Sequence, residues 1–257
     1  DGTDEGRRLR LKQQHFFVSC SLQDMLRSLE KRSIPITEFA KHWTVQLNDT
    51  HPAIAVAELM RLLIDQYQVG WDKAWNITTS SVAYTNHTLL PEALEKWDLS
   101  LFSDLLPRHL EIIYEINWRF LQQLRLRYPG DDKILQKLSI IDEEGSKSVR
   151  MAHLATIGAH HINGVAALHS DLIKRQLLPE FAQLWPEKFT NVTNGVTPRR
   201  WVALANPSLS NLLEKELGPN WITNMELLKN LEKKKDDSSF LEKYEETKLI
   251  GKRKLAS

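Results

Sequence analysis

Short strand-like runs alternate with helical runs along this chain, and each strand-like run is followed by a polar loop and then by a helix. The runs WTVQL (43–47), SVAYT (81–85) and FTNV (189–192) contain the β-branched and aromatic residues that are typical of strands. Strands that alternate with helices favour a parallel sheet flanked by helices, because parallel strands need a crossover connection. The sequence therefore predicts an α/β fold with more helix than strand.

Helical periodicity dominates the rest of the chain. Residues 8–31 predict an amphipathic helix whose apolar positions are Leu11, Phe16, Phe17, Leu22, Met25 and Leu29. Further helices are expected over 53–67, 72–78, 107–127, 148–176 and 199–217, and one more begins at Pro91. In that last helix, the dipole would stabilise Glu92 and Glu95 near its start. The Asn-Gly pair at 194–195 makes this turn the best candidate for a domain boundary.

Polar side chains gather in the loops that follow the first two strands. In open α/β sheets, ligands bind beyond the carboxyl ends of the strands. Asp49 supplies acceptors and His51 can donate or accept, a pairing that suits sugar hydroxyls. Asn86 and His87 repeat this chemistry after the second strand. The alternative for the first loop is that Asp49 or Thr50 caps the following helix, which Pro52 would open.

The third loop, TNGVTPRRW (193–201), has a different character. Gly195 is expected to supply a positive φ in a tight turn. Thr197 and Pro198 are expected at the start of the next helix, with Arg199 and Arg200 in its first turn. Cations there oppose the helix dipole, so an anion such as phosphate or a carboxylate is expected nearby.

Composition excludes several classes of protein. The formal net charge is +1, so no global field recruits nucleic acid or an anionic membrane. No apolar run is long enough to span a bilayer, and no signal peptide opens the chain, so a cytoplasmic location is predicted. The single Cys20 permits no disulfide within the chain, and no zinc or P-loop motif occurs, so no metal site is predicted.

From the residues alone, two readings stay open. The chain is either an α/β protein with a polar cleft for sugar or phosphate, or a structural domain whose strand-end His and Asn residues are caps. Longer sequence motifs help to choose between these two readings. LRLKQQHFFVSCSLQDML, VQLNDTHPAIAVAELMRLLID, AYTNHTLLPEALEKW, MAHLATIGAHHINGVAALHSDL and FTNVTNGVTPRRW closely resemble the α-glucan phosphorylase family, in the family's order.

That resemblance implies a GT-B architecture, with two Rossmann-like domains that face each other across a catalytic cleft. Residues 1–193 would be the C-terminal part of the glucan-binding domain, and 194–257 the start of the cofactor-binding domain. This makes the chain a helix-rich central fragment that spans the inter-domain region. The implied reaction is phosphorolysis: inorganic phosphate releases the terminal glucose of an α-1,4-glucan as glucose 1-phosphate. The implied cofactor is pyridoxal 5′-phosphate, and the full-length protein is expected to be a homodimer.

The resemblance also implies roles for residues that match its motifs. His87 and Asn194 would contact the glucosyl unit at the catalytic subsite, with Asn86 beside His87. Asp49 and His51 would line the adjoining glucan subsite, and Trp201 and Arg200 would contact the cofactor. A surface glycogen-storage site of some animal members would map to Tyr114, Asn117, Glu143 and Lys147, although Trp118 departs from that pattern.

The family's Schiff-base lysine is expected beyond residue 257, in a Gly-rich segment that this sequence lacks. The isolated chain is therefore predicted neither to retain pyridoxal phosphate nor to turn over glucan. The alternative function is a glucan-binding module without catalysis.

Overall fold

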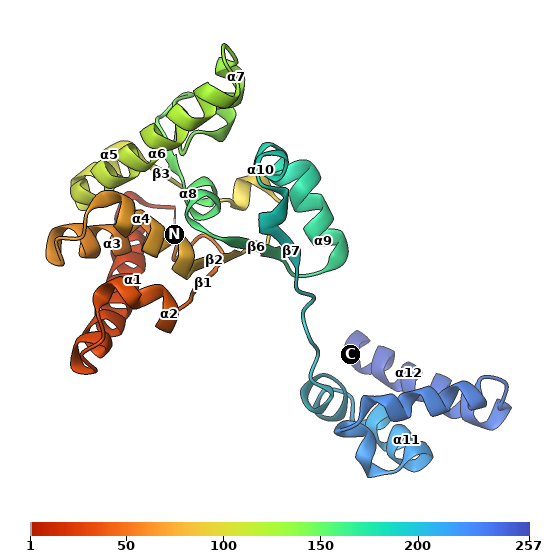
Figure 1. Ribbon diagram of the computed structural model, residues 1–257. Helices are drawn as coiled ribbons and strands as arrows, with labels where there is room; N and C mark the ends of the chain where they lie inside the picture. The colour runs from red at the N-terminus through yellow and green to blue at the C-terminus, as the bar shows by residue number, and fades with distance from the viewer. Residues whose placement is uncertain (1) are drawn as a thin grey trace. The chain divides into compact units, whose positions relative to one another are not determined.

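The computed structural model describes residues 2–257, and the chain divides into two compact units, Asp1–Thr193 and Asn194–Ser257 (Figure 1). The assignment of these units to parts of a glucan-binding and a cofactor-binding domain stays a prediction. Among the described residues, no helix is both long and apolar enough to cross a membrane.

A parallel sheet organises the first unit. It has four strands in the order β1-β2-β6-β7, and each neighbouring pair is parallel. The strands are β1 (Val45–Asn48), β2 (Val82–Thr85), β6 (His161–Gly164) and β7 (Phe189–Asn191). One row across the sheet is apolar, because Leu47, Tyr84 and Ile162 are in register and almost fully buried. The predicted helix-rich α/β fold with a parallel sheet is confirmed.

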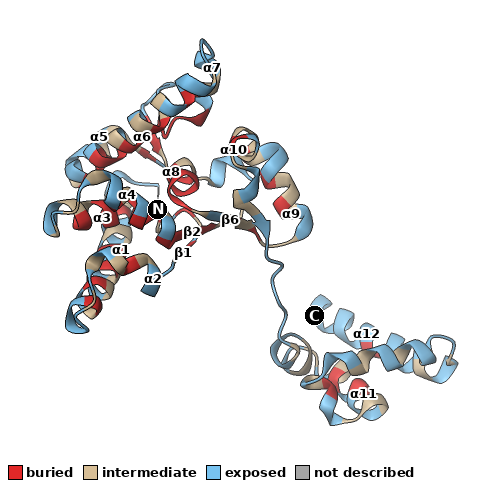
Figure 2. Cartoon of the chain, in the orientation of Figure 1, coloured by how far each residue is buried: buried red, intermediate tan, exposed pale blue. Residues whose placement is uncertain are grey.

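Helices that connect the strands form the core beside this sheet. They include α3 (Ala55–Arg61), which continues as a π-helical turn, α4 (Trp71–Ser81) and α8 (Met151–Gly158). Buried residues gather on β2 and α8 in Figure 2. Gly158 shows how closely α8 approaches α3, since a Cβ atom there would lie 2.6 Å from Cγ2 of Val56.

Other helices and a small sheet complete the first unit. The helices are α1 (Asp4–Lys31), α2 (Phe39–His42), α5 (Leu99–Leu105), α6 (Pro107–Arg127), α7 (Asp132–Leu138), α9 (Ala167–Leu172) and α10 (Pro179–Leu184). The small sheet is antiparallel, in the order β3 (Lys96–Asp98), β5 (Ser148–Arg150), β4 (Ile141–Asp142).

Two predicted helices are wrong because tertiary strand pairing overrides the local pattern. PEALEKW does not continue as a helix: a single 3₁₀ turn over Pro91–Ala93 leads into β3, where Trp97 is 3% exposed and pairs with Val149. The predicted helix over 148–176 is instead β5, α8, β6 and α9. The strand β6 lies inside the main sheet, between β2 and β7.

The apolar face of α1 also differs from the prediction. Its buried stripe runs through Leu11, Val18, Leu22, Leu26 and Leu29, residues three, four or seven apart. Phe16 and Phe17 fall outside that stripe, and each side chain is 71% exposed.

The second unit is helical. After a π-helical segment over Arg199–Leu204, it contains α11 (Pro207–Leu217) and α12 (Ser238–Ala256), joined by 3₁₀ segments over Pro219–Ile222 and Met225–Lys234. Its buried side chains include Leu212, Leu213 and the fully buried Trp221.

Candidate active site at the carboxyl edge of the sheet

Backbone hydrogen bonds continue past the strand ends and hold the following loops side by side. The amide of Asp49 donates to the carbonyl of Thr85 over 2.9 Å, and the amide of Asn86 donates to the carbonyl of Asn163 over 3.0 Å. The amide of Val192 donates to the carbonyl of Gly164 over 3.1 Å. The carboxyl edge of the sheet is therefore one continuous platform that carries the loops after all four strands.

The loop after β1 has an unusual backbone at Asp49, whose φ is 66°. Left-handed backbone is uncommon for a residue with a side chain, although Asp tolerates it better than most. The Asp49 carboxylate accepts a hydrogen bond from the amide of Thr50 over 2.6 Å. The helix-cap alternative is wrong here: α3 begins only at Ala55, after Ile54, and has no side-chain cap. Pro52 accordingly lies outside the first turn of α3.

His51 is half-exposed and is oriented by residues far away in the sequence. Its Nδ1 lies 3.2 Å from Nη2 of Arg10. Because a guanidinium can only donate, Nδ1 acts as the acceptor, and the remaining proton of a neutral His51 lies on Nε2. Arg10 in turn lies 3.2 Å from the carboxylate of Glu95, which also accepts from Gln14 over 2.9 Å.

Glu95 therefore does not stabilise a helix start, as its sequence position suggested. Its side chain is 9% exposed and lies 3.6 Å from Nδ1 of His51. This group could not be predicted from the sequence, because Arg10 and Gln14 come from α1, 85 and 81 residues before Glu95. Neither a motif nor a helical period joins positions that far apart.

In the loop after β2, Asn86 and His87 have different surroundings. Asn86 is fully buried: its Nδ2 donates to Oη of Tyr84 over 3.1 Å, and its Oδ1 accepts from the amide of Thr88 over 3.2 Å. The buried side-chain amide of Asn86 thus bonds to β2 through its nitrogen and to the loop backbone through its oxygen. His87 is exposed next to it, where it can reach a ligand.

His169 is a neighbour of His87 that the predicted helix over 148–176 concealed. Its Nδ1 accepts from the amide of Val165 over 3.0 Å, and this bond orients the ring. Burial first, and the charge of the nearby His87 second, lower the pKa of His169 below its ordinary value. The neutral form is favoured as a result, so this neighbour adds little positive charge beside His87.

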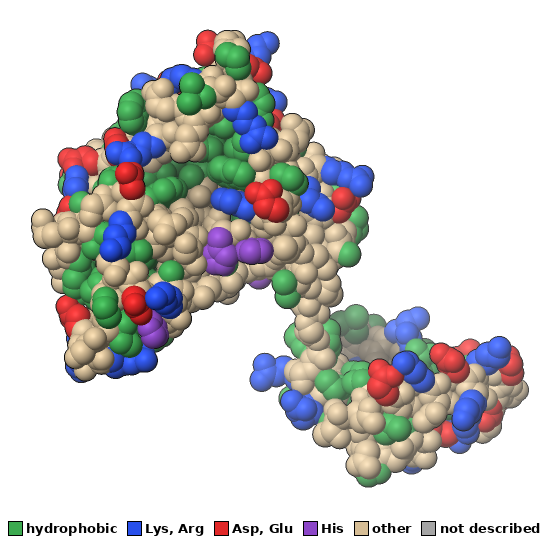
Figure 3. Space-filling model, viewed as in Figure 1, with side chains coloured by type: hydrophobic (Ala, Val, Ile, Leu, Met, Phe, Trp, Pro, Cys, Tyr) green, Lys and Arg blue, Asp and Glu red, His purple; other side chains and the backbone are tan. Residues whose placement is uncertain are grey.

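The loop after β6 depends on a close approach of α9. A Cβ atom at Gly164 would lie 2.4 Å from Oγ and 2.8 Å from Cα of Ser170. The Ser170 hydroxyl donates to Oδ1 of Asn191 over 2.8 Å, which links α9 to the end of β7. Histidine side chains are exposed on the face of the first unit shown in Figure 3.

The remaining predicted site residues lie in the second unit. Asn194 and Arg200 are exposed, and the indole of Trp201 is 63% exposed. The side chains of Arg200 and Trp201 make no hydrogen bond or ion pair within residues 2–257. The predicted turn at Gly195 is wrong: its φ is not positive, and the segment 192–197 is exposed and has no regular secondary structure or turn. Asp49, His51, Asn86 and His87 are therefore brought together by the first unit alone.

A model of the carbohydrate phosphorylase family matches residues 1–257. The chain belongs to this family. It is 58% identical to glycogen phosphorylase of Synechocystis sp. over 98% of its own length, and 49% identical to glycogen phosphorylase of Chlamydia trachomatis over its whole length. It is also 46% identical to α-glucan phosphorylase, H isozyme, of Solanum tuberosum. The chain spans 30%, 32% and 31% of these three relatives.

Within this carbohydrate phosphorylase chain, the positions matched to a storage site do not form one surface group. Tyr114 is 45% exposed on α6, and Glu143 and Lys147 are exposed. Asn117 is buried, and its Oδ1 accepts from the amide of Ile140 over 2.8 Å. Its amide therefore supports the segment that enters β4, and it does not face solvent.

Proposed function

We propose that this chain is the central part of an α-glucan phosphorylase. In the full-length protein, inorganic phosphate would cleave the terminal α-1,4-linked glucose of a glucan. The bond between C1 of that glucose and the bridging oxygen breaks, and a phosphate oxygen bonds to C1. The bridging oxygen takes a proton and becomes the new chain-end hydroxyl, so the products are glucose 1-phosphate and a shortened glucan.

The observation that carries this proposal is the platform at the carboxyl edge of the sheet. It presents the exposed imidazole of His87 together with the half-exposed His51 and the carboxylate of Asp49. These groups donate and accept hydrogen bonds, as sugar hydroxyls require. The relatives named glycogen phosphorylase make glucan the expected ligand. We assign His87 to the glucosyl unit at the catalytic subsite, and Asp49 and His51 to the adjoining glucan subsite.

The second unit is proposed to contribute Asn194 to the same sugar and to hold part of the cofactor. The exposed indole of Trp201 and the exposed guanidinium of Arg200 suit an aromatic ring and a phosphate group. When bound, pyridoxal 5′-phosphate would supply its phosphate group for proton relay. We further propose that the two units belong to the facing domains of a GT-B enzyme, and that this enzyme is a cytoplasmic homodimer.

The test is product formation by the full-length protein that carries this chain. With maltoheptaose, inorganic phosphate and pyridoxal phosphate, we expect glucose 1-phosphate, and none when phosphate is omitted. Release of free glucose without phosphate would show a hydrolase instead. Retention of maltoheptaose with no product at all would show a glucan-binding module without catalysis.

A further inference from the structure

Three side chains that can bind a metal ion meet between α1, α3 and α6: His15, Glu58 and His109. Their ligand atoms, one from each residue, all lie within 4.8 Å of one another. Within residues 2–257 they form the one group of three His, Cys, Asp or Glu side chains close enough to share an ion. The sequence predicts no metal site, because 51 residues separate Glu58 from His109 and zinc motifs pair ligands a few residues apart.

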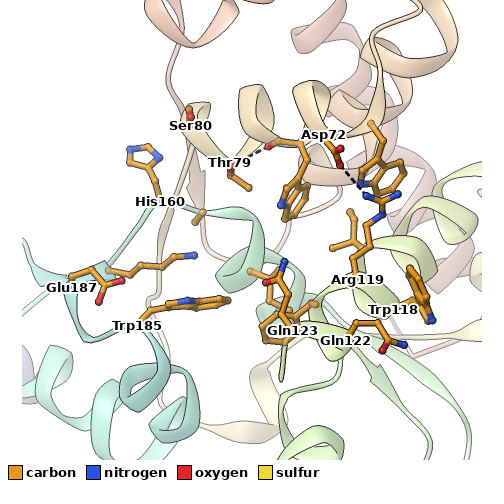
Figure 4. Close-up of a pocket in the computed structure, with 17 residues that line it drawn as sticks. Asp72, Thr79, Ser80, Trp118, Arg119, Gln122, Gln123, His160, Trp185 and Glu187 are labelled. Carbon is orange, nitrogen blue, oxygen red and sulfur yellow. Dashed lines mark hydrogen bonds and ion pairs between the residues drawn. The ribbon is translucent and has the colours of Figure 1, made fainter. Parts of the chain in front are cut away.

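A cavity at the edge where β6 and β7 begin also contains a histidine and carboxylates, but it does not bring them together (Figure 4). The carboxylate of Asp72 accepts from Arg119 over 2.9 Å and lies on the opposite side of the cavity from His160. No three ligands converge there among the described residues. The cluster between α1, α3 and α6 is therefore the candidate metal centre of the first unit.

The geometry of the two imidazoles suits a shared ion. Their rings meet edge to face, with 4.8 Å between ring centres and 81° between ring planes. Nε2 of His109 lies 2.6 Å from Oε2 of Glu58, and Nε2 of His15 lies 3.8 Å from the same oxygen. In a tetrahedral zinc site with bonds of about 2.1 Å, the ligand atoms lie about 3.4 Å apart. Shifts of less than about 1 Å in the two rings would therefore admit an ion.

Both imidazoles are prepared for ligation by their surroundings. Nε2 of His15 is buried and has no hydrogen-bond partner among the described residues, so an ion would supply the missing bond. The side chain of His15 as a whole is 27% exposed, which leaves a route for the ion and for a water molecule as fourth ligand. Burial lowers the pKa of His109 and favours the neutral imidazole that a metal requires.

Hydrogen bonds already hold the Glu58 carboxylate in place. Its Oε1 accepts from Oγ of Ser19 over 2.6 Å and from Nη2 of Arg61 over 2.8 Å. Contacts of this kind orient the ligating carboxylates of metal sites. Arg61 also donates from Nε to Oε2 over 2.7 Å, and its positive charge opposes that of an ion. Glu58 alone would therefore not hold a cation, and binding should depend on both imidazoles.

We propose that His15, Glu58 and His109 bind one Zn²⁺ ion, which joins α1, α3 and α6. Two imidazoles and one carboxylate are a ligand set that zinc takes, with water in the fourth position, whereas Mg²⁺ and Ca²⁺ prefer oxygen ligands. His15 directly follows Gln14, whose side chain donates to Glu95 over 2.9 Å. The ion would therefore fix the turn of α1 next to the candidate active site. This proposal does not depend on the proposed function.

The test is calorimetric titration of the full-length protein with zinc chloride, after a chelator has removed bound metal. We expect a zinc site that His15→Phe and His109→Gln each weaken about tenfold or more, since the loss of even an outer-shell partner costs about 10–100-fold. His15 is partly exposed, and His109→Gln keeps an amide that can donate to Glu58, so both variants are expected to fold.

His42→Phe is the matched control. The side chain of His42 is 28% exposed, close to the 27% of His15, and it lies 4.0 Å from a single carboxylate, that of Glu38. This substitution should leave zinc binding unchanged. Magnesium chloride in place of zinc chloride should produce no binding that depends on His15.

Three results would overturn the proposal. One is the absence of zinc binding, and another is a dissociation constant that His15→Phe and His109→Gln both leave unchanged, as when the ion binds elsewhere in the full-length protein. The third is an equal loss of affinity in His42→Phe. The readout is independent of catalysis: if zinc binding depends on His15 and His109 but no glucose 1-phosphate forms, the metal site stands and the proposed function fails.

Discussion

Glu58 is a fully buried carboxylate held by side chains from three helices, α1, α3 and α6. It accepts from Nε of Arg61 over 2.7 Å, from Oγ of Ser19 over 2.6 Å and from Nε2 of His109 over 2.6 Å. His15 lies 3.8 Å away. Burial would raise the pKa of Glu58, but the hydrogen bonds from Arg61, His109 and Ser19, together with the nearby imidazole of His15, outweigh it and hold that pKa below its ordinary value.

Replacement of this carboxylate is expected to destabilise the first unit strongly. Glu58→Gln leaves the Arg61 guanidinium without its buried counter-charge, and breaking a buried pair costs about 3 kcal/mol or more. Urea denaturation measures the free energy of unfolding. The matched control is Asp24→Asn, which removes an exposed partner of Arg27 and should change little. Equal effects of the two substitutions would contradict the role given to the Glu58 network.

His153 predicts a pH dependence at the residue scale. Its ring packs edge-on against Phe181, with 5.1 Å between ring centres, and burial lowers its pKa from 6.5 to about 4. Between these values the unfolded chain binds the proton and the folded chain does not, so stability is lost as the pH falls from 6.5 towards 4.

The variant His153→Gln has no imidazole at this position, so it lacks the pH-dependent stability that the lowered pKa of His153 contributes. The free energy of unfolding of the wild type, minus that of the variant, should therefore fall by no more than about 3 kcal/mol between pH 7 and pH 4. Urea titrations at a series of pH values give this difference. A difference that stays constant would show that folding leaves the pKa of His153 unchanged, and one that rises on acidification would show that folding raises it; either result contradicts the prediction.

At the scale of elements, the contact between α3 and α8 depends on a small residue. A Cβ atom at Gly158 would lie 2.6 and 2.7 Å from the two methyl carbons of Val56, both side-chain atoms. Gly158→Ala is therefore expected to destabilise the first unit by about 1–3 kcal/mol, as overpacking does.

Val56→Ala in the same chain should relieve this clash, because the new methyl group then occupies space that the valine leaves. The double variant is expected to be clearly more stable than the sum of the two single losses predicts. Urea denaturation of the wild type, both single variants and the double variant gives the four free energies of unfolding that a double-mutant cycle needs. Additive losses would mean that α8 shifts away from α3 instead of pressing on Val56.

Elements with a strong local pattern could be predicted from sequence, and elements defined by partners could not. The helix over Pro107–Arg127 and the strands β1, β2 and β7 have the expected periods, and the structure confirms them within a residue or two. By contrast, β3 is a strand because it pairs with β5, 50 or more residues later, and β6 is a strand because β2 and β7 flank it. No local period encodes such pairings.

The same distinction applies to the site. The loops after β1 and β2 could be located from sequence, since polar residues follow directly on strands. The groups that orient them could not: Arg10 and Gln14 come from α1, and His169 was hidden inside a predicted helix. The burial of Asn86 also escaped prediction, because it depends on a hydrogen bond to the buried Tyr84.

At the scale of the whole molecule, the central claim is that the carboxyl edge of the sheet carries catalysis in an α-glucan phosphorylase. The family is established over the full chain, and the roles of single residues are proposals. His87 and His161 offer a matched pair for testing them, because both are exposed histidines of the first unit. His87 follows the carboxyl end of β2, whereas His161 begins β6 at the opposite edge.

The most direct measurement is the rate of glucose 1-phosphate formation by the full-length protein, compared among wild type, His87→Ala and His161→Ala. We expect His87→Ala to lower kcat/KM on maltoheptaose by about 100-fold or more, since it removes a contact to the reacting sugar, and His161→Ala to leave the rate near that of wild type. Comparable rates for all three proteins, or a loss confined to His161→Ala, would contradict the assignment of catalysis to this edge.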